Sequence, residues 1–284
     1  MIGSRWRDEA RVPHVPSLAL QWRAILARAY VRVVGVNRDW VSLALEVVLP
    51  LFSVCSYALL YRSLKAPPAY VGYVVLGGAM TAYWLNVLWG MASQLYWEKR
   101  SGNLPLYLIA PMSRVALLAG MAAGGLISTT LRAASSALVG CWLFGVTIAP
   151  GTAAPLLGLF VLTLVALYGL GMMTSSVFLL WGREAWHISN LLQEPVYLLA
   201  GFYFPVRTLG NVAASVAGIL PITLGLDAMR QLMWPGAGAP FLAVGTELAL
   251  LAVQAVVYLT AAHRLLLYME RRSRQEGTLT LRYQ

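Results

Sequence analysis

Residues 155–181 read PLLGLFVLTLVALYGLGMMTSSVFLLW and contain no charged side chain. A helix needs about 20 mostly apolar residues to cross the hydrocarbon core of a membrane, so this stretch predicts a transmembrane helix. The composition of the whole chain agrees, because 59% of its 284 residues are hydrophobic and only 11% are charged. A soluble domain of this composition would lack the polar side chains that cover a surface. The sequence therefore predicts an all-α membrane protein with several spans.

Further apolar stretches of similar length flank this one on both sides. The predicted spans are 41–61, 71–96, 115–146, 155–181, 187–206 and 240–267. Residues 1–40 form an N-terminal segment, residues 41–268 the transmembrane domain, and residues 269–284 a tail. Because six spans is an even number, both termini lie on the same side of the membrane.

The distribution of positive charge predicts which side this is. Sixteen of the 21 Lys and Arg residues lie on the side of the two termini, and an excess of this kind is typical of cytoplasmic segments. We therefore expect a multi-pass protein of the plasma membrane, the inner membrane in a bacterium, with both termini in the cytoplasm. The net charge of +10 lies between and outside the apolar stretches, which favours contact with membrane lipids over a nucleic-acid partner.

Residues 17–38 predict a helix that does not cross the membrane. Apolar residues recur at helical spacing along one face, namely Leu18, Trp22, Ile25, Ala29 and Val33. Arg28 and Arg32 share another face. Such an amphipathic helix lies in the membrane interface with its arginines near anionic headgroups. The alternative is a cytoplasmic helix that packs on the protein's own loops.

The longest predicted cytoplasmic connection between spans is residues 97–114, within the sequence YWEKRSGNLPLYLIAPMSR of residues 96–114. Charged residues open it, a Ser-Gly-Asn turn comes next, and Asn103 suits the N-cap of a short helix. Leucines give that helix an apolar side before Pro111 ends it. A short capped helix on the cytoplasmic surface suits the docking of a partner, and a plain loop is the alternative. The residues that we single out are Glu98, Arg100, Gly102, Asn103, Leu104, Leu108 and Pro111.

Residues 207–234 are apolar but interrupted. Gly201 and Pro205 break the fifth span, and Pro221 splits the 207–234 stretch into two halves. Each half is too short to cross the membrane, so we expect a re-entrant helix pair that enters from outside and turns back. Asp227 and Arg230 would face water or each other there. Re-entrant elements on the outer side suit a gate, for which the candidate residues are Gly201, Phe202, Tyr203, Pro205 and Pro221.

Sequence motifs for enzymatic chemistry are missing from the chain. There is no phosphate-binding loop of the form G-x-x-x-x-G-K-[ST] and no H-E-x-x-H, C-x-x-C or G-x-S-x-G motif. We therefore expect no catalytic residues, no bound metal and no cofactor in this chain.

Two groups of motifs resemble the integral-membrane permeases of the ATP-binding-cassette type-2 exporter family, which export drugs, natural products or polysaccharides. The first matches the family's cytoplasmic loop at Glu98, Gly102, Leu104, Leu108, Pro111, Ser113 and Arg114. The second matches the end of the family's fifth span and the segment after it, at Gly201, Pro205, Leu220, Pro221, Thr223, Ala228 and Arg230. Asn103 and Pro105 stand where the family usually has threonine and glutamate.

The resemblance implies a permease that dimerises, with an identical or a sister chain, and pairs with a separate ATPase subunit. The segment from Glu98 to Arg114 would be the coupling helix, seated in a cleft of the ATPase. ATP and Mg²⁺ would be bound by that partner.

Four charged residues fall inside predicted spans, where charge is costly and commonly functional. They are Glu46, Arg132, Glu194 and Glu247. Arg132 and Glu247 lie at similar depth, counted along their helices, and we expect them to pair in the outer half. Glu46 and Glu194 lie in the inner half, for structure or for substrate contact. The motif Gly120-x-x-x-Gly124 permits close packing, either within one subunit or at a dimer interface.

The sequence thus predicts the permease of an ATP-driven exporter for an amphipathic substrate, such as a drug, a natural product or a lipid. A channel for a lipid-linked polysaccharide is the alternative within the same family. The aromatic residues Tyr57, Tyr61, Phe202, Tyr203 and Phe204 would line a transport pathway or lie at the outer interface. A proton-coupled secondary transporter is a third hypothesis, in which Glu194 would relay protons.

Overall fold

The computed structural model describes residues 17–36, 38, 40–103, 106–107, 110, 112–149 and 151–275. These residues form helices and connecting turns, with no strand among them. The helices are α1 (Leu18–Val36), α2 (Trp40–Ser63), α3 (Ala69–Leu85), the π-helix η1 (Asn86–Met91), α4 (Gln94–Arg100), α6 (Arg114–Phe144), α7 (Ala153–Leu199), the 3₁₀ helix η2 (Val206–Leu209), α8 (Asn211–Ala217), α9 (Pro221–Met233) and α10 (Val244–Gln275).

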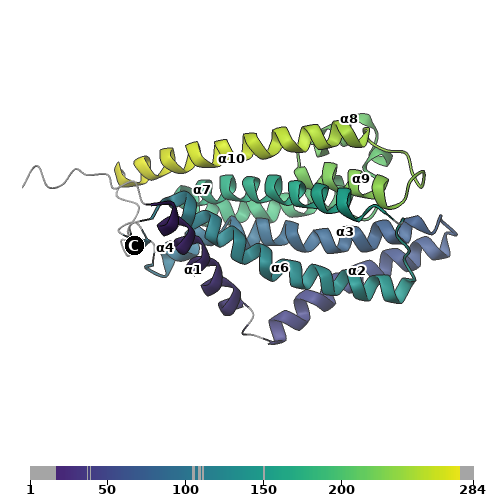
Figure 1. Cartoon of the computed structure of the whole chain (residues 1–284), viewed down its shortest axis with the longest axis horizontal. Helices are drawn as coiled ribbons and strands as arrows, with labels where there is room; N and C mark the ends of the chain where they lie inside the picture. The colour runs from purple at the N-terminus through teal and green to yellow at the C-terminus, as the bar shows by residue number, and fades with distance from the viewer. Residues whose placement is uncertain are drawn as a thin grey trace, which may run out of the picture.

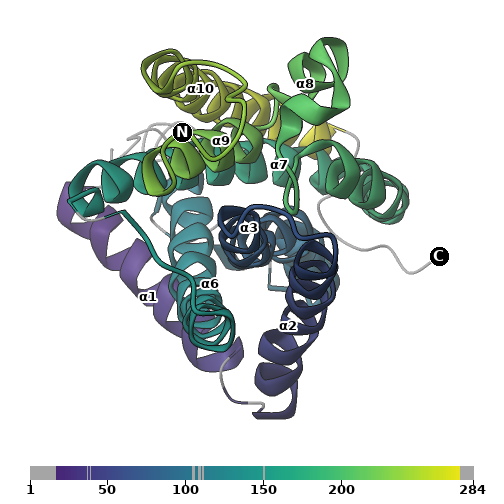
Figure 2. The ribbon, with the colours of Figure 1, turned by 90° about the vertical axis from the view of Figure 1, so that its right-hand side faces the viewer.

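The long helices lie along one axis and form an elongated bundle (Figure 1). α1 and α4 lie at one end, which we call the inner end, and α8 and α9 lie at the opposite end, the outer end. Seen from the outer end, α3 occupies the middle of the bundle, with α2, α6, α7 and α9 around it (Figure 2). α3 is accordingly the most buried of the apolar helices, whereas α2 is covered on only a small part of its surface.

Among the described residues, five helical stretches are long and apolar enough to cross a membrane, and a sixth would be added if the bent pair α8 and α9 counted as one. The five are Ala44–Ser63, Ala69–Met91, Val115–Phe144, Ala153–Ser176 and Val244–Tyr268, and they match five of the predicted spans. The chain is thus a multi-pass membrane protein. The remaining predicted span, 187–206, includes side chains outside the described set and stays a prediction.

The residues of α7 are helical from Ala153 to Leu199, but the chain doubles back within this stretch. Gly171 packs against Val87 and Met91 of the π-helix, and Gln193 accepts a hydrogen bond from Trp89 Nε1 at 2.7 Å. In a straight helix these two positions would lie ~33 Å apart. The chain therefore reverses between Gly171 and Gln193, and α7 contributes two antiparallel arms to the bundle.

The pair α8 and α9 is bent by 111°, at the break that Pro221 predicted. Pro221 is the first residue of α9, where its missing N–H costs nothing. Arg207, just before α8, donates a hydrogen bond to the carbonyl of Pro240, just after α9, at 2.8 Å. The chain therefore enters and leaves the pair at the same end of the bundle. This geometry agrees with a re-entrant pair, although its two helices have 7 and 13 residues rather than equal lengths.

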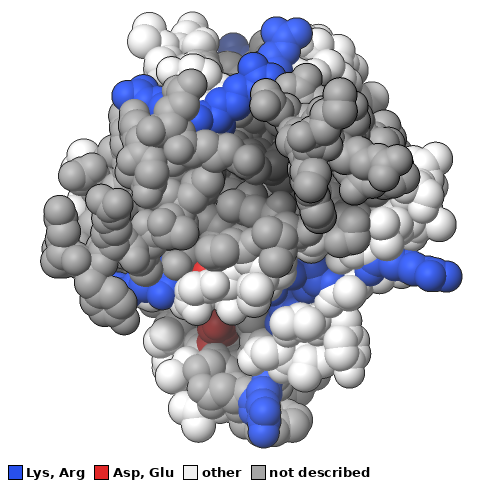
Figure 3. Space-filling view, turned by 90° about the vertical axis from the view of Figure 1, so that its left-hand side faces the viewer, with Lys and Arg blue, Asp and Glu red and all other residues white. Residues whose placement is uncertain are grey.

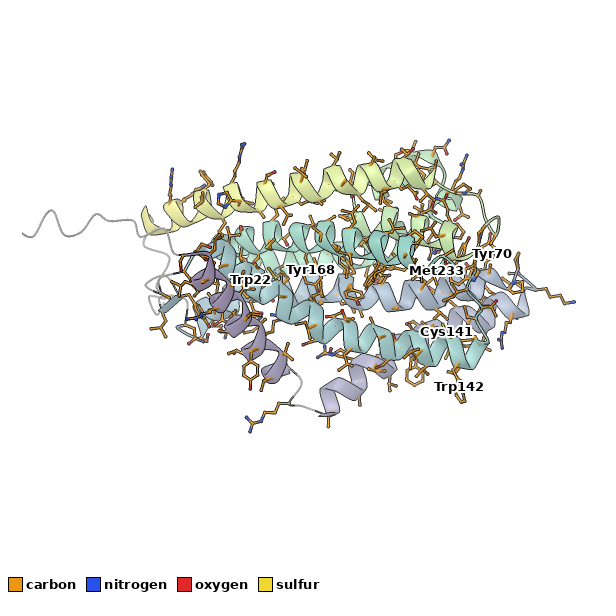
Figure 4. The ribbon with its side chains drawn as sticks, viewed as in Figure 1. Trp22, Tyr70, Cys141, Trp142, Tyr168 and Met233 are labelled. Atoms are coloured by element: carbon orange, nitrogen blue, oxygen red, sulfur yellow. The ribbon has the colours of Figure 1, made fainter. Side chains whose placement is uncertain are left out.

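Helix α1 packs on the inner half of α6 through two glycines. Gly120 faces the backbone of Ile25 and Gly124 faces that of Ala29, each too close for a Cβ atom. The Gly120-x-x-x-Gly124 motif thus serves packing within the subunit. Among the described residues, the apolar side chains of Leu18 and Trp22 stay exposed, with Trp22 at the inner end in Figure 4.

Arg28 and Arg32 of α1 do not point outward as the sequence analysis expected. Arg28 forms an ion pair with Glu98, and Arg32 donates a hydrogen bond to Gln94. The prediction was wrong because helical spacing separates an apolar face of α1 from a polar one but does not show which face packs against the rest of the protein. The placement of α1 in the membrane interface stays a prediction.

Replacing Gly124 with valine should separate α1 from α6. The new side chain would overlap the carbonyl of Ala29, and overpacking of this kind costs about 1–3 kcal/mol. The thermal unfolding midpoint of the purified protein in detergent measures the loss. Gly158→Val, on α7 in open space, is the matched control and should leave the midpoint nearly unchanged. Equal midpoints for the two variants would contradict this packing.

Candidate functional site

A cavity of about 890 Å³ lies between α2, α3 with η1, α6 and the second arm of α7. Its lining mixes three kinds of side chain. Aromatic residues are Tyr57, Trp89, Tyr197, Tyr203 and Phe204, charged ones are Arg32, Glu46, Arg132 and Glu194, and uncharged polar ones are Ser53, Thr81, Asn86, Ser128 and Thr129. A cavity of this size and lining accommodates a drug-sized amphipathic molecule.

Three of the four intramembrane charges line this cavity, namely Glu46, Arg132 and Glu194. Arg132 forms an ion pair with Glu46 of α2, and this corrects the expected pair of Arg132 with Glu247. The side chain of Arg132 is buried, whereas that of Glu46 is about half exposed. Glu194 is exposed and faces the same cavity from α7.

Glu247 lies elsewhere, in a polar cluster beneath the outer end. Its side chain is fully buried and accepts a hydrogen bond from Gln231 Nε2 at 3.0 Å. The same amide donates to Asp227 at 2.9 Å, which also accepts from the backbone N–H of Phe241. Similar depth had suggested Arg132 as the partner of Glu247, but the two side chains leave their helices in different directions.

Arg230 of α9 holds the irregular backbone after the end of α7. It is buried and donates hydrogen bonds to the carbonyls of Phe204 at 3.0 Å, Phe202 at 2.7 Å and Tyr73 at 3.2 Å. The expectation that Asp227 and Arg230 face water or each other was wrong. Instead, the free carbonyls of a broken helix need donors, and a guanidinium supplies several at once.

Four of the five predicted gate residues, Gly201, Phe202, Tyr203 and Pro205, lie in this loop, whereas Pro221 begins α9. Gly201 has a φ of 71°, a conformation that favours glycine, and Phe202 is fully buried with its carbonyl against Gly77. The ring of Tyr203 stacks on Tyr57 with centroids 4.4 Å apart, so both close the outer end of the cavity. Pro205 lines a separate outer pocket of about 320 Å³.

At the inner end, Glu98 of α4 is buried and receives several donors. Besides Arg28, Gln94 Nε2 donates to it at 3.1 Å and Asn103 Nδ2 at 3.2 Å. Gln94 in turn accepts from Arg32, which lines the cavity. A chain of hydrogen bonds therefore runs from Asn103 to the cavity wall. We call Asn103, Glu98, Gln94, Arg28 and Arg32 the inner network.

The remaining coupling residues are described only in part. Gly102 has a φ of 76°, as the predicted turn requires, and Asn103 begins a helical turn through its carbonyl while its side chain binds Glu98. Arg100 lies over the ring of Trp97. Leu104, Leu108 and Pro111 lie outside the described residues, so the coupling helix stays a prediction.

Burial alters the ionisation of two groups of the inner network region. It raises the pKa of the Tyr107 phenol, whose oxygen accepts a hydrogen bond from Arg28 at 2.9 Å. It also lowers the pKa of Arg32, which nonetheless stays charged, since guanidinium groups do not deprotonate in proteins. The phenol is therefore neutral and the arginines are positive at physiological pH.

Several cavity residues were not predicted from the sequence. Asn86 begins the π-helix and accepts a hydrogen bond from Tyr168, which lies inside the bundle in Figure 4. Gly125, Ser128 and Thr129 share with the predicted Arg132 a spacing that places them on one face of α6, and all four line the cavity. That spacing was a readable signal, because small and polar residues rarely share one stripe of a lipid-facing helix.

Arg230→Gln should destabilise the protein by several kcal/mol, because buried carbonyls lose their donors. The measurement is the thermal midpoint together with the yield of folded protein. Arg207→Gln is the matched control, since Arg207 also donates to a carbonyl but in an exposed position, and it should change little. If both variants lose the same stability, the outer loop does not depend on Arg230.

Separate patches of Lys and Arg lie around the surface of the inner end among the described residues (Figure 3), and Trp142 points outward near the outer end (Figure 4). Both features suit a protein whose ends lie at membrane interfaces. A search of curated proteins found no match. The family model of the ABC-2 type transporter matches residues 20–234. Because this match covers most of the chain, the chain belongs to the ABC-2 type transporter family and is an ABC permease component.

Proposed function

We propose that this chain is the permease subunit of an ATP-driven exporter, which moves an amphipathic substrate out across the plasma membrane. The observation that carries the proposal is the cavity of about 890 Å³ with its mixed apolar, polar and charged lining. A drug, a natural product or a lipid has the matching chemistry, with apolar and polar parts in one molecule. Both termini face the cytoplasm in this proposal.

The energy would come from a separate ATPase subunit. Members of this family normally pair with one, and the sequence contains no phosphate-binding loop. ATP and Mg²⁺ are bound by that subunit, and two permeases assemble with two ATPases. The segment 97–114 docks on the ATPase.

The inner network gives this docking a route to the cavity. Glu98 is buried, so it acts inside the permease rather than on the ATPase surface. A push on the 97–114 segment moves Asn103 and Glu98, which are joined through Gln94 to Arg32 at the cavity. Charged hydrogen bonds of this kind resist stretching and transmit displacement.

A lipid-linked polysaccharide is the second candidate substrate. The stacked pair of Tyr57 and Tyr203, together with Trp89 and Tyr197, gives the cavity several aromatic faces. Aromatic faces also suit sugars. A proton-coupled secondary transporter is the third candidate, in which Glu194 would carry the proton.

The test of the function is purification from the native host in mild detergent. The proposal expects an ATPase subunit to co-purify, and its ATP hydrolysis to depend on the permease. Disrupting the turn at Gly102 should abolish the association. A chain that purifies alone and supports flux driven by a pH gradient in liposomes would contradict the proposal and favour the Glu194 mechanism.

Breaking the inner network should reduce transport while the permease and the ATPase stay associated. In Glu98→Gln the side chain keeps its shape but loses the charge that holds Arg28, so transport should fall at least about tenfold while the ATPase still co-purifies. Arg28→Gln should have the same effect, and the double variant should be no worse than either single one.

The matched control is Arg23→Gln, on the exposed surface of the same helix. It should transport normally. Additive losses in the double variant would show that Arg28 and Glu98 act separately, and would contradict the network.

A further inference from the structure

The walls of the cavity carry charges of opposite sign. They are Arg32 of α1, Arg132 of α6, Glu46 of α2 and Glu194 of α7. Both arginines carry nitrogen atoms without a hydrogen-bond partner, and these atoms indicate what the cavity binds.

Several buried polar atoms of the cavity lining have no partner among the described residues. Arg132 Nε and Nη2, Arg32 Nε and Ser128 Oγ are buried without a hydrogen-bond partner. Each of them can donate a hydrogen bond. Leaving buried donors unpaired is costly, so an acceptor that enters the cavity gains more here than in water. A cation would be repelled by the two arginines, and of the two carboxylates in the lining Glu46 is already paired with Arg132.

The geometry of Arg132 indicates which chemical group can act as the acceptor. Its Nη1 is engaged by Glu46, which leaves the edge formed by Nε and Nη2. The two N–H groups of that edge are parallel and match two oxygens of one phosphate or carboxylate group. Ser128 lies one helical turn before Arg132 on the same face and can add a third donor.

The rest of the lining suits an apolar tail. Leu49 and Pro50 of α2, Leu85 of α3 and Leu198 of α7 line the same cavity, and Tyr57, Tyr203 and Phe204 close its outer end. A molecule with an anionic group and a hydrocarbon part can therefore satisfy both regions at once.

We propose that the cavity binds amphipathic anions, whose phosphate or carboxylate group pairs with the Nε–Nη2 edge of Arg132, assisted by Ser128 and Arg32. This inference rests on the proposed permease function and names its substrate class. The ligand is an exported amphiphile or an anionic membrane lipid, since both carry the same chemistry.

The test is equilibrium binding of radiolabelled decyl phosphate to the full-length permease in phosphatidylcholine nanodiscs. Saturable binding is expected, with weak competition from decanol, decyltrimethylammonium and inorganic phosphate. Equal competition by decanol or decyltrimethylammonium would overturn the anionic class, and equal competition by inorganic phosphate would overturn the amphiphile. If phosphatidylglycerol added to the nanodiscs displaces decyl phosphate, the proposal holds with a membrane lipid as the ligand. If phosphatidylglycerol does not displace decyl phosphate, the proposal holds with an exported amphiphile as the ligand.

Two substitutions should move the affinity in opposite directions. Arg132→Gln should weaken decyl phosphate binding at least about tenfold, since the paired edge is lost. Glu46→Gln should strengthen it severalfold, because it frees the third nitrogen of Arg132. Arg62→Gln, on the same helix as Glu46 but outside the cavity lining, is the control and should bind normally. Unchanged binding in both Arg132→Gln and Glu46→Gln would overturn the site.

If Arg132→Gln does not fold, Ser128→Ala and Arg132→Lys replace it, and both should weaken binding severalfold without a change in thermal midpoint. Unaltered binding in both would overturn the site.

The permease function is tested separately with the co-purified ATPase. If decanol stimulates its ATP hydrolysis as strongly as decyl phosphate, the function stands and the anion site fails. If no ATPase associates but the binding of decyl phosphate still depends on Arg132, the anion site is supported and the proposed exporter function is contradicted.

Discussion

Every backbone group that lies within the hydrocarbon of a membrane must find its partner inside the protein, and the outer half of this fold depends on how that is achieved. Helix α7 ends at Leu199, and the backbone is irregular from there until η2 begins at Val206. Arg230 donates to three carbonyls there, one of which belongs to α3. The end of α7, the first turns of α3 and the re-entrant helix α9 are thereby held together, and with them the outer wall of the cavity.

At the inner end, another arginine has a different role. Arg28 pairs with a carboxylate, Glu98, rather than with carbonyls, and Glu98 lies next to the segment that precedes α6. An arginine bound to fixed carbonyls anchors a loop, whereas an arginine bound to a side chain on another helix links two elements that can move relative to each other. The π-helix η1 lies between these two ends, and irregular turns of this type are frequent at functional sites. In the proposed coupling, a displacement that starts at the inner end would reach the cavity before it reaches the outer loop.

The spans and the helix breaks could be predicted because each depends on local sequence. Hydropathy located α3 and α10, and Gly201 and Pro221 marked breaks because their backbone preferences act within a few residues. The partners of buried charges could not be predicted in this way. Depth along the helices suggested Glu247 as the partner of Arg132. However, successive side chains also point in directions that differ by about 100° around the helix axis. Which direction faces a given neighbour is decided by how the helices pack, and depth alone does not reveal it. The faces of Arg28 and Asp227 were misjudged for the same reason, and the π-helix left no pattern in the sequence.

Comparison of two buried arginines separates structure from binding. Arg230 and Arg132 are both almost inaccessible, so both carry the cost of removal from water. Arg230 offsets it through three carbonyls, which fix its position and leave only its Nε unpaired. Arg132 has only Glu46, which is half exposed, and it keeps two unpaired nitrogens beside an open cavity. An arginine required only for folding would be expected to resemble Arg230, so the incomplete pairing of Arg132 is best explained by a partner that the protein itself does not supply.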